Sequence, residues 1–331
     1  MQNFILIFLI SFSVCFLIGY PYVKFLTKKQ FNQTILEYVE IHSSKKNTPT
    51  MGGIMFVVSA IIVNLIFCRE NNFLIILCLL SMFGFALIGF LDDFIKIKFK
   101  RNLGLTPVQK VIGQGGIALI LSLFCYFSKY NIQTFIPFSQ TTINLSLGII
   151  FIILFVIIGT VNSVNLIDGL DGLATKVTLV YLLAFGVIIT ITADKLYYLG
   201  YSELDIFEMQ NMAKGCISLA GSLLAFLIFN CNKAKVFMGD VGSLALGGFV
   251  ASVGVLSGLW LYIPILGVLY VVTALSVILQ VLYYKKTKKR IFLMAPLHHH
   301  FEQKGVNEQK IVSIYTILSI IIALICIYFT M

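Results

Sequence analysis

The sequence predicts an all-α, polytopic integral membrane protein with about ten transmembrane helices, and three observations carry this prediction. Of the 331 residues, 59% are hydrophobic and only 11% are charged. The mean hydropathy of +0.97 is far above that of a water-soluble domain. Apolar runs of roughly 20 residues, enough to cross a bilayer as a helix, recur along the whole chain. This composition excludes a soluble globular enzyme and a disordered chain.

The expected helices follow one another with short polar connections. None of the runs alternates with the period of two that an outer-membrane barrel requires. No small-residue cleavage site follows the first run, which is therefore expected to remain as an anchor. The seven cysteines include no CxxC pair and predict no disulfide framework. The helices are expected near residues 3–24, 51–68, 72–91, 108–127, 143–164, 175–193, 213–230, 242–260, 263–284 and 311–329.

The net charge of +10 is unevenly distributed between the two ends of these helices. With alternating spans, one side carries all of the 24 Lys and Arg residues except Arg69, Lys129, Lys195 and Lys214. The positive-inside rule makes that side cytoplasmic and puts both termini outside. The basic cluster at 285–290 is interpreted as a topology signal that also meets anionic lipid. No nucleic-acid partner is expected.

The whole chain, residues 1–331, is expected to form one transmembrane domain whose active-site loops are cytoplasmic. These loops hold most of the polar residues that lie between the apolar runs. They are expected at residues 28–50, 92–107, 162–174, 230–241 and 285–310.

Acidic residues gather at the cytoplasmic ends of the predicted helices. Asp92 and Asp93 close the third helix, Asp168 and Asp171 follow the fifth, and Asp240 precedes the eighth. A single Asp at a membrane boundary is usually a solvated helix end. Here the acids come from three loops and lie beside Gly or Asn, residues that allow close backbone approach and local hydrogen bonds. We therefore expect them to form a functional site.

Adjacent carboxylates repel one another unless a cation screens them, which favours Mg²⁺ held by carboxylates and substrate phosphates. Lys45, Lys96 and Lys110 lie on the same side and are suited to anionic partners. Lys96 follows Asp92 by four residues, so the two could form an ion pair along one helix. Alternatively, Lys96 holds a substrate phosphate, and the spacing leaves both interpretations open.

Two further loops have a recognisable pattern. In segment 48–53, Thr50 precedes a helix whose first N–H groups could bind an anion, although as a bare pattern an N-cap with a tight turn is the simpler explanation. His298, His299 and His300 are consecutive, and successive helical residues turn by about 100°. This disfavours a zinc site, which needs spaced ligands. Hydrogen bonding to a polar substrate or simple capping of a surface helix remain as interpretations.

In these segments the sequence resembles the polyprenyl-phosphate N-acetylhexosamine-1-phosphate transferases. The resemblance covers the whole chain, and the run MAPLHHHFE is similar to the muramoyl-pentapeptide branch of that family. The segments that carry it, in the family's order, are 45–53, Asp92 and Asp93 with Lys96, 162–174, 230–244 and 294–302.

The resemblance implies a multi-pass enzyme of the bacterial inner membrane with its active site on the cytoplasmic face. Such an enzyme moves phospho-N-acetylmuramoyl-pentapeptide from UDP-N-acetylmuramoyl-pentapeptide to undecaprenyl phosphate, giving lipid I and UMP. The implied cofactor is Mg²⁺, and the implied partners are these two substrates and the lipid bilayer. A homodimer is a further expectation, although the sequence does not fix the oligomeric state.

The resemblance also implies roles for individual residues. Asp92, Asp93 and Asp240 correspond to the catalytic and metal-binding acids. Gly169, Leu170 and Asp171 resemble the uracil-binding loop, and Phe237 resembles the aromatic residue on which the base stacks. The remaining residues expected to bind substrate are Lys45, Thr50, Lys96, Lys110, Asn162, Asp168, Asn230, His298, His299 and His300.

Two rival functions fit parts of the same pattern. A secondary transporter should carry ionisable groups near the bilayer midplane, but the apolar runs are nearly free of charge at mid-span. A sister enzyme that transfers N-acetylglucosamine phosphate is closer, and the three histidines are the main feature that disfavours it.

Overall fold

The computed structural model describes residues 2–29, 48–99, 103–128, 133–139 and 141–331. In this part of the chain, nine helices are long and apolar enough to span a membrane. They are Gln2–Lys29 (α1), Phe73–Lys98 (α3), Pro107–Phe127 (α4), Gly148–Ile167 (α5), Leu173–Tyr198 (α6), Glu203–Asn230 (α7), Gly239–Leu256 (α8), Val268–Thr287 (α10) and Glu308–Thr330 (α12).

Three shorter helices and one small hairpin complete the described fold. They are Gly53–Phe67 (α2), Tyr262–Leu266 (α9), Leu297–Gln303 (α11), and the antiparallel strands Thr134–Phe135 (β1) and Thr142–Ile143 (β2). The all-α polytopic prediction is confirmed, and each predicted apolar run coincides with one helix or, for the ninth run, two.

Several boundaries differ from the prediction: α3 extends to Lys98, beyond the predicted end at 91, so Asp92 and Asp93 lie within the helix and do not close it. Two further differences have identifiable causes. The ninth run, 263–284, is broken at Gly267 into α9 and α10. The seventh helix begins at Glu203, ten residues before the predicted 213–230, because its polar first turns have partners. Glu208 in this extension accepts hydrogen bonds from the N–H groups of Phe73 (3.1 Å) and Leu74 (2.9 Å), which lie in the first turn of α3. These carboxylate bonds satisfy donors that a helix start otherwise leaves open.

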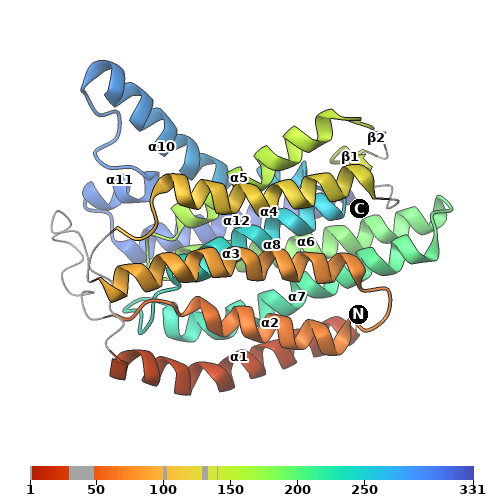
Figure 1. The fold of residues 1–331 in the computed structure, drawn as a ribbon, viewed down its shortest axis with the longest axis horizontal. Coiled ribbons are helices and arrows are strands. Elements are labelled where there is room, and N and C mark those ends of the chain that lie inside the picture. Colours follow the sequence, from red (N-terminus) through yellow and green to blue (C-terminus); the bar gives the residue numbers. More distant parts are fainter. Residues whose placement is uncertain (1, 30–47, 100–102, 129–132, 140) are drawn as a thin grey trace.

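The most buried helix is α8, which packs against α2, α3 and α5 (Figure 1). Of its apolar stretch 89% is buried, against 22% for α10, which leaves the bundle at an angle. Glycines allow this close packing. A Cβ on Gly89 of α3 would collide with the backbone carbonyl of Asp240, and one on Gly53 would collide with Gly242 of α8. The start of α8 is thus fixed against two neighbouring helices.

When α2 is counted with the nine long helices, successive helices run in opposite directions, so the connections alternate between two ends of the molecule (Figure 1). The start of α1 and the end of α12 lie at one end, together with the hairpin. The end of α3, the start of α4 and α11 lie at the other. The acidic residues singled out in the sequence therefore lie at the end opposite the termini.

Candidate active site

Three carboxylates converge at this end of the bundle. Asp92 and Asp93 lie near the end of α3, and Asp240 lies in the first turn of α8. One carboxylate oxygen from each lies within 4.8 Å of the others. Asp92 and Asp93 are buried, and Asp240 is partly buried. We call these three residues the acidic cluster.

Two lysines enter the acidic cluster from different helices. Lys96 Nζ lies 2.6 Å from Asp92 Oδ2 and 3.2 Å from Asp240 Oδ2. Lys110 Nζ lies 2.7 Å from Asp240 Oδ2 and 3.1 Å from Asp92 Oδ1. The ion pair expected from the spacing of Asp92 and Lys96 is therefore present, and it extends to a second carboxylate.

Local sequence explains how Lys110 reaches the acidic cluster. Thr106 and Gln109 form a reciprocal capping box at the start of α4, with Pro107 in its first turn. This cap fixes where α4 begins and so places Lys110 in its first turns. Just before it, the N–H of Leu105 donates to Asp92 Oδ1 at 2.7 Å. The loop and the helix start are thereby both attached to the end of α3.

The charges in the acidic cluster do not cancel. Three carboxylates face two ammonium groups, which leaves one excess negative charge if all five groups are ionised. The N–H of Val241 donates to Asp93 Oδ2 at 3.2 Å, but neutral donors leave the net charge unchanged. Oxygen donors with surplus negative charge match the preference of a hard divalent cation such as Mg²⁺. The residues present therefore fit such an ion.

The segment before α2 pairs with the segment before α8. The N–H groups of Gly52 and Gly53 donate to the carbonyls of Phe237 and Met238, each at 2.9 Å. These N–H groups are thus not free for an anion, and no side chain caps the helix. The tight turn of the second interpretation is present, with Met51 at a φ of +70°. The Thr50 hydroxyl is buried and has no hydrogen-bond partner among the described residues.

Gly239 shows how close Thr50 is to the acidic cluster. Its φ of +73° favours glycine, and a Cβ there would lie 2.5 Å from Asp93 Oδ2 and 2.7 Å from Thr50 Oγ1. Glycine is therefore needed both for the turn and for the space between these two side chains.

Asn165 is a site residue that sequence reasoning did not single out. Its side-chain amide donates to Asp240 Oδ1 at 3.1 Å and to Ser243 Oγ at 2.8 Å. Asn165 therefore holds Oδ1 of Asp240, whereas both lysines contact Oδ2. The available signal was its place one helical turn after Asn162, within the segment that ends at Asp168.

Two predicted asparagines are engaged within the fold. The amide of Asn162 donates to Gln114 Oε1 at 2.7 Å. Asn230 is buried, accepts from Thr175 Oγ1 at 2.7 Å and donates to the Val236 carbonyl at 3.0 Å. Asn230 therefore holds the turn before α8, and its contact with substrate stays a prediction.

The loop between α5 and α6 is fixed from two sides. The N–H of Asp171 donates to Glu308 Oε1 at 2.8 Å, and Asp171 Oδ2 accepts from the N–H of Ala234 at 3.0 Å. Leu170 is buried, whereas Asp168 and Gly169 are partly exposed. Burial, followed by the charges of Asp240 and Asp171, raises the pKa of Asp168 to about 7.

The three histidines have three different environments. His298 is fully buried, neither ring nitrogen has a hydrogen-bond partner among the described residues, and burial lowers its pKa to about 3. His299 Nδ1 lies 2.9 Å from Glu302 Oε2, and His300 Nδ1 accepts from the N–H of Leu293 at 3.0 Å. The rings of His298 and His299 are close, with centroids 4.4 Å apart, but the three imidazoles differ in their hydrogen-bond partners.

Comparison with known proteins identifies the lineage. Residues 74–258 match the family described as glycosyl transferase family 4, and residues 45–57 match signature 1 of phospho-N-acetylmuramoyl-pentapeptide-transferase. The transferase of that name from Clostridium perfringens (strain 13 / Type A) is 43% identical over 316 residues, covering 94% of each chain. This chain belongs to the phospho-N-acetylmuramoyl-pentapeptide-transferase family.

Other members of the transferase family match along nearly the full length. The phospho-N-acetylmuramoyl-pentapeptide-transferase of Caldanaerobacter subterraneus subsp. tengcongensis is 42% identical over 330 residues, or 99% of this chain and 98% of the relative. The transferase of that name from Geobacillus sp. (strain WCH70) is 39% identical over 331 residues, with the same coverage. The whole described fold is thus that of a transferase-family member.

The family matches cover the site unevenly. The acidic cluster, both of its lysines and the 168–171 loop fall within 74–258, and Thr50 falls within the transferase signature. The three histidines lie outside both segments. Lys45 belongs to the signature but lies outside the described residues, so its predicted role has no structural counterpart here.

Proposed function

We propose that this chain transfers phospho-N-acetylmuramoyl-pentapeptide from its UDP carrier to undecaprenyl phosphate, releasing UMP and forming lipid I. The observation that carries the proposal is the acidic cluster with Lys96 and Lys110, in a chain about 40% identical over its length to transferases of this name. The proposed site faces the cytoplasm from the bacterial inner membrane. The homodimer stays a prediction.

The reaction is chiefly an electrostatic problem. A phosphate monoester has a second pKa near 6 and is largely dianionic at neutral pH, so the attacking lipid phosphate needs little help from a base. Two phosphorylated substrates repel each other, and positioned cations lower this barrier. Lys96 and Lys110, each already within 3.2 Å of Asp240, are placed to hold the phosphates at the acidic cluster.

We assign the Mg²⁺ site to Asp92, Asp93 and Asp240. When bound there, the ion would neutralise charge on the diphosphate. Asn165 holds one oxygen of Asp240 at 3.1 Å, so the carboxylate is oriented before substrate arrives. Leu105 does the same for Asp92 through its N–H at 2.7 Å. These contacts lower the reorganisation needed in the transition state.

The two ends of the sugar nucleotide are assigned to neighbouring loops. The 168–171 loop would bind uracil, with Phe237 as the stacking residue, and the histidine helix α11 would meet the peptide end. A Cβ on Gly169 would lie 2.9 Å from His299 Nε2, so the loop and the histidines are in contact. Imidazole nitrogens can donate to or accept from the lactyl and peptide groups that UDP-N-acetylglucosamine lacks.

The test is UMP release by purified protein given undecaprenyl phosphate, Mg²⁺ and either UDP-N-acetylmuramoyl-pentapeptide or UDP-N-acetylglucosamine. Release only with the muramoyl substrate, and its loss when Mg²⁺ is chelated, are the expected results. Asp240→Asn protein serves as the inactive control. Release with UDP-N-acetylglucosamine alone would assign the sister reaction instead, and no release with either substrate from folded protein would refute the proposal.

A further inference from the structure

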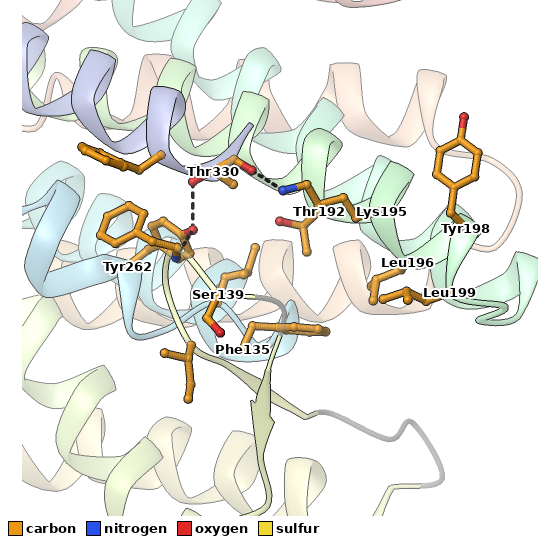
Figure 2. A pocket seen from close by; sticks show the side chains of 13 residues that line it. Phe135, Ser139, Thr192, Lys195, Leu196, Tyr198, Leu199, Tyr262 and Thr330 are labelled. Carbon is orange, nitrogen blue, oxygen red and sulfur yellow. Dashed lines mark hydrogen bonds between the residues drawn. The ribbon is translucent and has the colours of Figure 1, made fainter.

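A cavity of about 310 Å³ opens at the end of the molecule opposite the acidic cluster. Figure 2 shows it between the end of α6, the end of α12, the region of α9 and the hairpin segment. Nothing in the proposed reaction uses it. Its walls combine aromatic and aliphatic side chains with one cation, Lys195, and a few hydroxyl groups.

Lys195 has no carboxylate partner among the described residues. Its ammonium donates to the Thr330 carbonyl at 2.6 Å, in the last turn of α12 (Figure 2). A lysine has three donors, so this bond leaves two of them for another acceptor. The end of a helix carries only about half an elementary charge. Asp194 is adjacent in sequence, but it lines a different cavity with Tyr197 and Glu203. Among the residues that line this cavity, Lys195 is thus the one with a charged side chain.

Hydrogen bonds hold the walls of the cavity in place. The Tyr262 hydroxyl shares a hydrogen bond of 2.8 Å with Thr330 Oγ1 and accepts from the N–H of Phe138 at 3.3 Å. These contacts join α9, α12 and the hairpin segment. The cavity is thus largely preformed, as ligand sites usually are, and a ligand entering it would not need to reorganise these elements.

The rim of the cavity is apolar and exposed. Tyr198 is 86% exposed, Leu199 61% and Phe329 60%. All three lie at the ends of spanning helices, where bilayer headgroups meet the hydrocarbon. A single cation set behind an apolar, aromatic rim at this depth matches an amphiphile with an anionic head and an apolar tail.

We propose that this cavity binds the headgroup of an anionic phospholipid from the leaflet opposite the acidic cluster. Lys195 would donate its two remaining N–H groups to the phosphate, and the acyl chains would lie against the exposed rim. A zwitterionic lipid is disfavoured, because its own ammonium group would approach Lys195. The proposal is independent of the transferase reaction.

The test is native mass spectrometry of the full chain in detergent, titrated with dioleoyl phosphatidylglycerol. At low lipid concentration the wild type should retain one more lipid per chain than Lys195→Gln. Loss of a charge-assisted bond should weaken this lipid about tenfold or more. Lys195→Arg should restore it. Lys214→Gln is the matched control, because Lys214 also donates to a neutral oxygen, Asn211 Oδ1 at 2.9 Å, but lies outside the cavity.

A second variant guards against a folding effect of losing the Lys195 contact with α12. Thr192→Phe fills the cavity but keeps the lysine, and it should also lose the extra lipid. UMP release in detergent that contains undecaprenyl phosphate but no phospholipid should be unchanged in both variants, which separates this test from that of the proposed function. Equal lipid retention by wild type and Lys195→Gln, or equal binding of phosphatidylcholine, would overturn the proposal. Equally tight binding of soluble glycerol phosphate would also overturn it and indicate a free-anion site.

Discussion

Lys110 Nζ lies 2.7 Å from Oδ2 of Asp240, so the first turns of α4 and α8 meet through one ion pair. The same ammonium lies 3.1 Å from Asp92 Oδ1, which adds the end of α3. Lys110 therefore links three helices where they converge, and it shares the neutralisation of their carboxylates with Lys96. Its removal should affect chemistry and local structure together.

Asp240→Asn should reduce kcat to less than about a tenth of wild type, a loss of more than roughly 1.4 kcal/mol of transition-state stabilisation. The amide keeps the shape of the side chain but removes the charge that a metal and two lysines require. UMP release measures the effect, and an unchanged thermal midpoint shows that the fold is intact. More than a tenth of wild-type turnover would exclude an essential role for this carboxylate.

Lys110→Gln should lower kcat/KM by at least about tenfold, because the glutamine cannot neutralise Asp92 and Asp240. Lys98→Gln is the matched control, since Lys98 is an exposed lysine in the last turn of α3 with no carboxylate contact among the described residues. It should retain near-wild-type kinetics. Similar losses in both variants would show that general positive charge at this surface matters, not the position of Lys110.

Asn165→Ala should reduce kcat with little change in KM, because it frees one oxygen of Asp240 without removing its charge. Asn165→Asp should be more severe, since it adds a fourth carboxylate to a site with excess negative charge. The control is Ser163→Ala, on the same helix. The Ser163 hydroxyl donates to the Gly159 carbonyl at 2.6 Å and has no other hydrogen bond within the described part of the chain. Steady-state UMP release compares all three, and full activity of Asn165→Ala would remove the positioning role.

His299→Ala should weaken use of the muramoyl substrate while leaving binding of UMP unchanged. Its ring is held by Glu302 at 2.9 Å and faces the 168–171 loop, so its loss affects the peptide end without disturbing the acidic cluster. The measurements are kcat/KM for the muramoyl substrate and Kd for UMP, and the ratio of the two is compared between variant and wild type. An unchanged ratio in alanine variants of all three histidines would leave the choice of sugar unexplained.

His298 should make the fold less stable at acidic pH. Its folded pKa of about 3 lies below the unfolded value near 6.5, so the unfolded state binds more protons between these values. The contribution of neutral His298 to the free energy of unfolding is therefore fully present above pH 6.5. Below pH 6.5 it falls by about 1.4 kcal/mol per pH unit. The drop in thermal midpoint from pH 7.5 to 5.5 should be smaller in His298→Asn than in wild type.

The spans and the acidic helix ends could be predicted because their signals are local. Hydropathy marks a span within one run of residues, and Asp92, Asp168 and Asp240 stand where such runs end. The partners of Asp240 could not be predicted in the same way. Lys110 and Asn165 are 130 and 75 positions away, and only the packing of α4 and α5 around α8 brings them to it.

The errors in segment 48–53 and in α7 share a physical cause. A helix start with free N–H groups looks the same in sequence whether a ligand or a distant backbone satisfies them. In this fold the carbonyls of Phe237 and Met238 do so for α2, and Glu208 does so for α3. Sequence periodicity contains no information on such long-range partners.

The position of the two termini has a practical consequence. Both lie at the end opposite the acidic cluster (Figure 1). An affinity handle fused to either terminus would emerge from the far surface of a nanodisc. The enzyme could then be immobilised on a sensor chip with its reactive surface turned toward the flow, and water-soluble nucleotide inhibitors could be screened without detaching it.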